Sequence, residues 1–174
     1  SLGKLGKKTL IIDLDPQGNT TTGLGVNKGE IKASIYDVLN GDSPIKKAIK
    51  KTSFDLLSII PATINLAGID YELLEKGHND SEFKKNEQLR NALSEVKDNY
   101  DYIIIDCPPS LGVLTTNALV ASDSVIIPVQ CEFFALEGIS QLLNTIIMTQ
   151  TRLNPNLKIE GVLLTLLDSR TNLG

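Results

Sequence analysis

Three aspartates follow two apolar segments, and their positions are the chain's clearest indication of chemistry. Asp13 and Asp15 close the segment Thr9–Asp15, and Asp106 closes Tyr102–Asp106. A carboxylate at a strand end adds nothing to a hydrophobic core and is costly to bury, so folding alone does not explain this pattern. Ligands of α/β proteins bind at the carboxyl ends of the strands. The pattern predicts a site for phosphate and a metal ion at one edge of a sheet.

Asp106 is a candidate metal-binding residue. It is followed by Cys107 and then by Pro108 and Pro109, whose rings restrict the next turn. Mg²⁺ keeps several waters and takes few protein ligands, so a carboxylate on a rigid strand end suits its water shell. The alternative role is structural: a helix N-cap, or a hydrogen bond to a backbone turn.

Asp13 and Asp15 are two residues apart, so on a continuing strand they would point to the same face. One would assist the metal or a phosphate-binding group, and the other would orient an attacking water. Such roles suit phosphoryl transfer, in which the protein mostly positions groups and neutralises charge. The alternative is that this pair caps and forms the turn ahead of Pro16.

The segment after Asp15 is rich in glycine and threonine. Gly18, Gly23 and Gly25 allow a mobile loop with positive φ angles. No GxGxxG pattern opens a helix here, which argues against a dinucleotide fingerprint. His78, the only histidine, lies in a polar turn, and no Ser/His/Asp or Cys/His arrangement can be built around it.

Basic residues gather in one short segment. Lys46, Lys47, Lys50 and Lys51 are expected on one face of a short helix. A solvated face is the favoured interpretation, and binding of DNA or a protein partner is the alternative. Arg170 follows the last predicted strand and, from the residues alone, is an exposed arginine.

The composition is that of a globular domain. The chain has 174 residues, 41% hydrophobic and 22% charged, with a net charge of −4. This length predicts one domain or most of one, and the mild charge means that nucleic-acid contact would need a local basic patch. No apolar stretch approaches the roughly 20 residues that span a bilayer, and we find no signal peptide. Cys107 and Cys131 are isolated, which suits a reducing cytoplasm and apolar packing rather than metal or redox roles.

Apolar and amphipathic segments alternate along the chain. Strands are predicted at Thr9–Leu14, Leu56–Ile60, Tyr102–Asp106, Ser124–Val129 and Ile159–Leu166. Helices are predicted at Ile64–Lys76, Glu82–Asn99, Val113–Ala121 and Ala135–Leu153. The strands are continuously apolar, which favours burial on both faces and a mostly parallel sheet flanked by helices, an α/β fold.

Five segments resemble the ParA-type partitioning ATPases, a branch of the deviant Walker P-loop family. They are LIIDLDPQGNTTTGLG, IPATINLAG, YDYIIIDCPPSLG, ASDSVIIPVQCEFFALEGISQLL and IEGVLLTLLDSRTNLG. These segments span nearly the whole chain in order. The resemblance implies a P-loop NTPase-like three-layer sandwich and one partial nucleotide-binding domain over residues 1–174.

The resemblance also implies roles for individual residues. Asp106 would be the Walker B aspartate, acting on Mg²⁺ through water, and Asp15 would position the hydrolytic water. Asp13 would support catalysis from the same strand end. Residues 107–112, with Pro108 and Pro109, would sense the γ-phosphate of ATP.

Two further regions gain roles only from the resemblance. Thr165 to Asp168 would lie near the adenine, and Arg170 matches a position that contributes to non-specific DNA binding. The family cycle comprises ATP-driven homodimerisation, DNA binding, and hydrolysis stimulated by a centromere-binding, ParB-like partner. It implies a cytoplasmic, nucleoid-associated protein without a membrane partner.

The deviant Walker A loop of the family, KGGVGKT in one-letter code, is absent from these residues. We therefore expect the family's first strand and C-terminal helices to be missing too, so that the chain is truncated at both ends and inactive alone. Two alternatives stay open. One is the related MinD-like ATPase of the cell-division site, which binds membranes, and the other is a nucleotide-free interaction module. Retention of the three aspartates argues against the module, and the missing loop argues for it.

Overall fold

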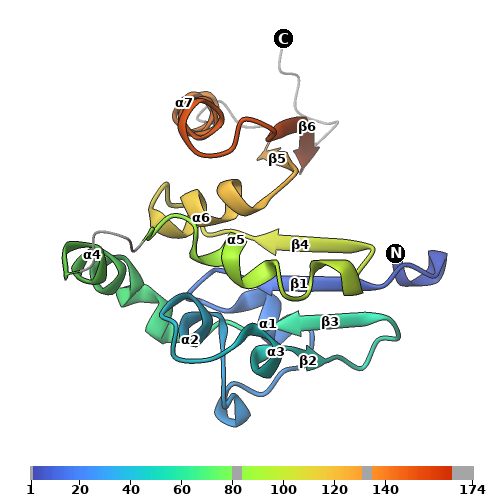
Figure 1. The fold of residues 1–174 in the computed structure, drawn as a ribbon. Helices are drawn as coiled ribbons and strands as arrows, with labels where there is room; N and C mark the ends of the chain where they lie inside the picture. Colours follow the sequence, from blue (N-terminus) through green and yellow to red (C-terminus); the bar gives the residue numbers. More distant parts are fainter. Residues whose placement is uncertain (1, 80–83, 131–134, 166–174) are drawn as a thin grey trace. The chain divides into compact units, whose positions relative to one another are not determined.

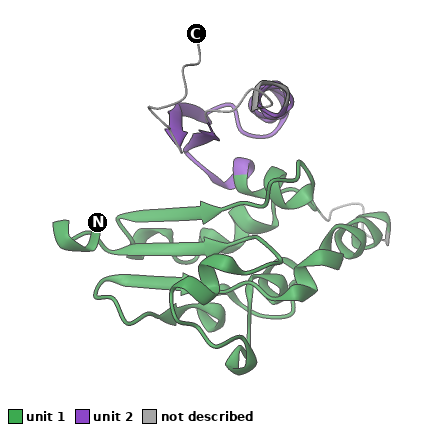
Figure 2. Cartoon of the chain, turned by 180° about the vertical axis from the view of Figure 1, so that it is seen from behind, with its two compact units in different colours: residues 1–118 green, residues 119–174 purple. Residues whose placement is uncertain are grey.

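A computed structural model describes residues 2–79, 84–130 and 135–165. The chain divides into two compact units, residues 1–118 and residues 119–174 (Figure 2). Each unit is described by itself below. The single domain expected over residues 1–174 stays a prediction.

The first unit is built on a four-stranded sheet (Figure 1). Its strands are β1 (Thr9–Asp13), β2 (Lys50–Lys51), β3 (Leu57–Ile60) and β4 (Tyr102–Asp106), in the order β2-β3-β1-β4. β1 runs parallel to both β3 and β4, whereas β2 pairs antiparallel with β3. The predicted mostly parallel sheet is therefore confirmed.

Burial differs between the strands of this sheet. β1 lies between two partners, and its Leu10 and Ile12 are fully buried. β4 is an edge strand among the described residues, and Tyr102 and Ile104 are 48% and 45% exposed. The expectation that every strand is buried on both faces is thus right for β1 and wrong for β4, because β4 has one strand neighbour rather than two.

Short helices accompany the sheet. The α-helices that lie wholly in this unit are α1 (Asn19–Gly23), α2 (Ile35–Leu39), α3 (Ile45–Ala48), α4 (Ile69–Asn79) and α5 (Gln88–Leu93). The 3₁₀ turns are η1 (Leu2–Leu5), η2 (Lys28–Glu30), η3 (Ile64–Gly68) and η4 (Lys97–Asn99). The helix predicted at Ile64–Lys76 is observed as η3 followed by α4. Of the helix predicted from Glu82 to Asn99, residues 82 and 83 lie outside the described residues, and within the rest only α5 and η4 are helical.

Local capping and packing explain why α2 forms where it does. Ser34 precedes it and forms a capping box with Asp37, in which the Ser34 amide donates to the carboxylate at 2.7 Å. The helix packs against α3, α5 and η3. Ile35 and Leu39 of this helix are fully buried.

The basic segment does not form one helical face. Lys46 and Lys47 lie on α3, which ends at Ala48 because Ile49 is already extended (φ −70°, ψ 126°). Lys50 and Lys51 form β2 instead and pair with β3. The predicted helical arrangement of the four lysines is therefore wrong.

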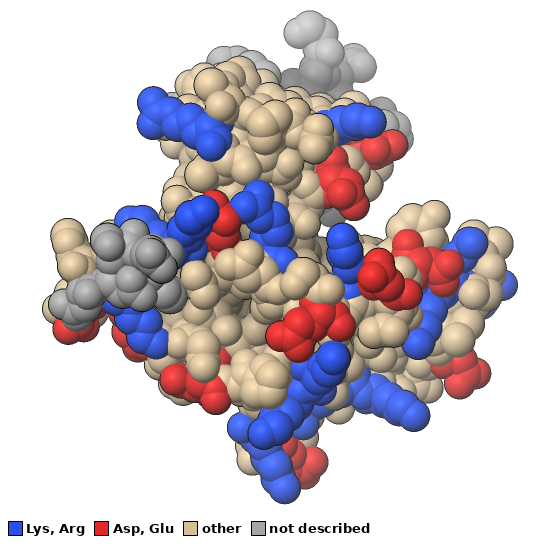
Figure 3. All heavy atoms as spheres, in the orientation of Figure 1, with Lys and Arg blue, Asp and Glu red and all other residues tan. Residues whose placement is uncertain are grey.

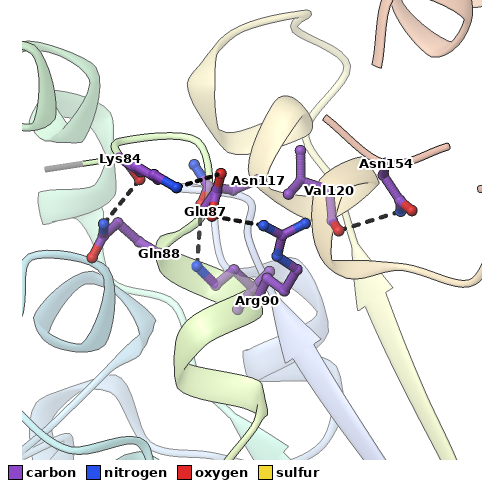
Figure 4. A network of polar contacts seen from close by, with 8 residues as sticks. Lys84, Glu87, Gln88, Arg90, Asn117, Val120 and Asn154 are labelled. Carbon is purple, nitrogen blue, oxygen red and sulfur yellow. Dashed lines mark hydrogen bonds and ion pairs between the residues drawn. The ribbon is translucent and has the colours of Figure 1, made fainter. Parts of the chain in front are cut away.

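A buried asparagine fixes the packing of α5 beside α6 (Val113–Ala121) (Figure 4). The Asn117 side-chain Oδ1 accepts from the Leu89 amide at 3.1 Å, and its Nδ2 donates to the carbonyls of Lys85 and Val113 at 2.8 and 3.0 Å. Arg90 forms an ion pair with Glu87 at 2.6 Å on the adjoining surface of α5. The boundaries of α6 agree with the prediction.

The second unit is a β-α-β arrangement. β5 (Ser124–Gln130) and β6 (Lys158–Thr165) are parallel, and α7 (Ala135–Arg152) connects them. The core of this unit consists of Leu119, Ile127, Val129, Ile146 and Leu157. β6 is largely exposed, because this sheet has only two strands in the described residues, so continuous burial is wrong for β6 as well.

Asn154 joins the turn after α7 to the end of α6 within the second unit. Its Nδ2 donates to the carbonyls of Leu119, Val120 and Ser122 at 3.0, 3.3 and 2.8 Å, and the bond to Val120 is drawn in Figure 4. Those carbonyls lie at the end of α6, where helix geometry leaves acceptors without helical partners. Among the described residues, no helix is long and apolar enough to cross a membrane.

Candidate functional site

The carboxyl ends of β1 and β4 bring two of the predicted acids together. Asp13 and Asp106 are register partners across the parallel pair. The Leu14 amide donates to the Asp106 carbonyl at 2.8 Å, so the pairing continues one residue past β1. The chain then turns at Asp15 and enters α1.

Asp13 is fully buried and fully engaged by hydrogen bonds. Its Oδ2 accepts from both the amide and the hydroxyl of Thr21, each at 2.7 Å, and its Oδ1 accepts from the Asp15 amide at 3.1 Å. The Thr21 hydroxyl in turn accepts from the Ala62 amide at 2.9 Å. These contacts are those expected of the capping and turn alternative, and they tie together β1, α1 and the segment after β3.

Asp15 is half-buried, and its side chain starts a turn. Its Oδ1 accepts from the Gln17 amide at 2.9 Å, and its carbonyl accepts from the Gly18 amide at 2.8 Å. Within the described residues its Oδ2 has no hydrogen-bond partner. One carboxylate oxygen is therefore fixed by the backbone, while the other is free to accept from a water molecule.

Asp106 is exposed, and a threonine holds one of its oxygens. The Thr20 hydroxyl donates to Oδ2 at 2.6 Å, at the short end of the range for O–H···O bonds. Because Thr20 and Thr21 are neighbours on α1, this helix contacts both strand-end acids. Together, these contacts define the geometry of the candidate site.

The donor set fits Mg²⁺ held largely by water. In the described part of the chain, we find no group of three or more His, Cys, Asp or Glu side chains that could hold a metal ion. A Mg²⁺ ion needs only one or two carboxylates when waters and phosphate oxygens complete its shell. The exposed carboxylate of Asp106 can supply that contact.

The segment after β4 has an unusual thiol. Cys107 is exposed, yet desolvation and, secondly, the neighbouring Asp106 carboxylate raise the pKa of its thiol to about 12. The thiol is therefore neutral at physiological pH. The residues that follow, Pro108 and Pro109, are half-buried and exposed respectively, and the predicted phosphate contacts of both stay predictions.

Gly112, at the end of this segment, lies close to the side chain of Asp70. A Cβ atom there would lie 2.8 Å from Oδ2 of Asp70, on α4. The carbonyl of Gly112 accepts from the Thr116 amide and hydroxyl, both at 3.1 Å, so the segment leads directly into α6.

The remaining predicted residues lie elsewhere. Thr165 ends β6 in the second unit, where its hydroxyl donates to the Val129 carbonyl at 3.2 Å. Asp168 and Arg170 lie outside the described residues. Sequence reasoning missed Thr20 and Thr21, although the run Asn-Thr-Thr-Thr just after a strand-end acid was an available signal for side chains that hold carboxylates.

The fold and the strand-end acids define an α/β protein of the P-loop NTPase-like class. A family model described as an AAA domain (AAA_31) matches residues 1–159, and the chain belongs to that family, among the ParA and Soj partitioning ATPases. Sporulation initiation inhibitor protein Soj of Bacillus subtilis is 56% identical over 99% of the chain and 66% of its own length. Chromosome partitioning protein ParA of Myxococcus xanthus is 49% identical over 99% and 59%.

A solved structure shows the same fold. It is cobyrinic acid a,c-diamide synthase from Mycobacterium smegmatis with bound ATP analog and magnesium. Its TM-score is 0.89 at 42% identity, covering 98% of this chain and 67% of the other. The chain spans about two thirds or less of the length of the two relatives above.

Proposed function

We propose that this chain is part of an ATP-dependent switch of DNA segregation. The protein would bind ATP with Mg²⁺, dimerise around two nucleotides, bind DNA without sequence preference, and hydrolyse ATP when a ParB-like partner stimulates it. The observation that carries the proposal is the pair of strand-end acids in register, Asp13 and Asp106, with Asp15 in the turn beyond. The names of the relatives support the same process.

The three acids would have different roles, because their hydrogen-bond partners differ. Asp106 would hold the water shell of Mg²⁺, which when bound would neutralise charge on the phosphates. Asp15 would position the attacking water, because one of its oxygens is fixed by Gln17 while the other lacks a partner in the described residues. Asp13 would act through Thr21 by keeping α1 beside the site.

The finer roles rest on the family resemblance. Pro108 and Pro109 would sense the γ-phosphate, Thr165 and Asp168 would contact the adenine, and Arg170 would contact DNA. Figure 3 shows Lys and Arg mixed with Asp and Glu on the face drawn rather than a field of one sign. DNA binding would therefore use a local patch, and its affinity would fall steeply with added salt. The protein would be cytoplasmic and associated with the nucleoid.

ATP binding with Mg²⁺, measured by calorimetry, tests the proposal. The 174-residue chain would be compared with a version extended upstream to include a Walker A loop. We expect binding only by the extended version, and a loss of hydrolysis with retained nucleotide binding in its Asp15→Ala variant. Failure of both proteins to bind would overturn the proposal and favour a nucleotide-free interaction module.

A DNA-binding assay tests the role of Arg170. The extended protein and its Arg170→Ala variant would be titrated with duplex DNA at several salt concentrations in the presence of ATP. We expect weaker binding by the variant and a shallower dependence of the affinity on salt, because a lost phosphate contact releases fewer counterions. An unchanged salt dependence would remove Arg170 from the interface.

A further inference from the structure

The hydroxyl of Thr20 makes a contact for which the proposed roles of the acids do not account. Thr20 lies in the first turn of α1 and is half-buried, whereas Asp106 ends a different strand, 86 positions along the chain. Their 2.6 Å bond is a tertiary contact at the candidate metal site. The contact is not an N-cap of α1, because it joins two side chains and does not involve a backbone amide of the helix.

The neighbouring contacts keep Thr20 in place. Thr21 is tied to Asp13 through its amide and hydroxyl, and to Ala62. The hydroxyl of Thr22 donates to the carbonyl of Gly18 at 3.1 Å. Since Thr21 and Thr22, which follow Thr20 on α1, make hydrogen bonds of their own, the backbone that carries Thr20 is held beside Asp106 by contacts other than the Thr20–Asp106 bond.

A hydrogen bond to one carboxylate oxygen restricts the orientation of the other. With Oδ2 of Asp106 bound to Thr20, Oδ1 has no hydrogen-bond partner in the described residues. Groups that orient a side chain bound directly to a metal are worth about 10–100-fold in metal affinity, and a carboxylate that acts through the ion's waters should fall at the lower end of that range. A hydroxyl with this geometry therefore has a measurable role wherever Asp106 holds the water shell of a divalent cation.

We propose that Thr20 is a positioning residue that orients the Asp106 carboxylate for hydrated Mg²⁺. Its hydroxyl fixes Oδ2, so that Oδ1 is presented to the ion's waters without a reorientation cost. Thr20 touches neither nucleotide nor metal in this role and acts only through Asp106. The inference rests on the proposed function, since it concerns the metal of that same site.

Three variants of the extended protein test the Thr20 hydroxyl independently of the rest of the Thr20 side chain. Thr20→Val keeps the shape and removes the hydroxyl, whereas Thr20→Ser keeps the hydroxyl. Thr22→Val is the matched control, because it removes a hydroxyl from the same helix that contacts neither carboxylate. Melting temperatures without metal would show that all three fold.

The readouts are the apparent affinity for Mn²⁺ in the presence of ATP, followed by electron paramagnetic resonance, and the Mg²⁺ dependence of hydrolysis. We expect Thr20→Val to weaken Mn²⁺ binding about 10-fold and to raise the Mg²⁺ concentration for half-maximal rate equally, with kcat at saturating Mg²⁺ little changed. Thr20→Ser and Thr22→Val should behave like the unaltered protein.

The outcomes distinguish this inference from the function on which it rests. Wild-type affinity in Thr20→Val, or the same loss in Thr22→Val, would overturn the positioning role while leaving the ATPase proposal intact. An unaltered protein that binds no Mn²⁺ with ATP would overturn the proposed function, and the inference with it. A fall in kcat at saturating Mg²⁺ without a change in metal affinity would also exclude the positioning role.

Discussion

At the scale of single residues, the buried pair Asp13 and Thr21 has the largest predicted effect on stability. The Thr21 hydroxyl both donates to Asp13 and accepts from the Ala62 amide. Thr21→Val keeps the volume but leaves that amide without its acceptor in a buried place, which costs about 1–3 kcal/mol. We expect a fall of that size in the free energy of unfolding, measured by urea denaturation followed by circular dichroism.

Thr22→Val is the control for this prediction as well. Thr22 is exposed, and within the described residues its hydroxyl bonds only to the Gly18 carbonyl. The free energy of unfolding of Thr22→Val should therefore stay within about 0.5 kcal/mol of that of the unaltered chain. Equal effects of the two substitutions would mean that the Asp13 network does not stabilise the fold beyond the helix propensity of valine.

Cys107 provides a prediction about pH. Its thiol has a pKa raised from 9.0 to about 12, first by desolvation and then by Asp106, so the neutral form persists at pH 8. A raised pKa means that the thiolate fraction grows only as pH rises towards 12. The thiolate is therefore scarcer than that of an ordinary thiol at the same pH, and we expect alkylation of Cys107 at pH 8 to be slower than that of an ordinary thiol.

The measurement is the rate of iodoacetamide labelling followed by mass spectrometry, in a Cys131→Ser background that leaves one thiol. Asp106→Asn should speed labelling at Cys107, because it removes one of the two causes of the raised pKa. Labelling at the rate of a free cysteine at pH 8 would contradict the prediction.

At the scale of elements, Gly18 determines how β1 passes into α1. It precedes the helix with φ +63°, and a Cβ there would lie 3.0 Å from Cε and Nζ of Lys28. Left-handed backbone costs a residue with a Cβ about 1–2 kcal/mol, so Gly18→Ala should destabilise the chain by about that amount. Gly23→Ala is the matched control, because its φ is negative and nothing lies within 4 Å of its Cβ.

Thermal unfolding of both variants checks this prediction. Gly23→Ala should leave the melting temperature unchanged or raise it, since alanine restricts the unfolded chain more than glycine does. A Gly18→Ala variant as stable as the Gly23→Ala variant would show that α1 tolerates another entry geometry. The position of both threonines beside the acids would then not depend on Gly18.

Elements with a clear local pattern could be predicted from the sequence. The bounds of β4 and α6 agree to the residue, because an apolar run ending in acid, and a helical run beginning after glycine, are local signals. The bonds of Thr20 to Asp106 and Thr21 to Asp13 could not be predicted, since they depend on how α1 folds back over two strands. The same limit explains the lysines of β2, whose extended form comes from pairing with β3 rather than from local preference.

At the scale of the molecule, the two units differ in how well they cover their apolar residues. In the first unit the sheet residues of β1 are covered on both faces, and Asn117 of α6 bonds to the Leu89 amide of α5 and to the Lys85 carbonyl just before that helix. In the second unit α7 packs on β5, through Ile146, while much of β6 stays uncovered. The three strand-end acids, Asp13, Asp15 and Asp106, belong to the better covered unit.

The uncovered residues of the second unit predict self-association of the 174-residue chain. Ile126, Val162, Leu163 and Leu164 are each 57–63% exposed on two paired strands. Exposed apolar side chains gathered on two paired strands promote association. We expect sedimentation velocity to show a mass that rises with concentration, and the dye ANS to bind.

A double substitution tests whether those side chains are responsible. Val162→Thr with Leu164→Thr keeps β-strand propensity while removing apolar surface from one face of β6, so it should lower both the association and the dye binding. Lys158→Thr on the same strand is the control and should change neither. A chain that stays monomeric as its concentration rises, without binding dye, would mean that these side chains are covered in solution. Association that survives the double substitution would instead point to other exposed apolar residues, of which Tyr102 and Ile104 on β4 are the next to exchange.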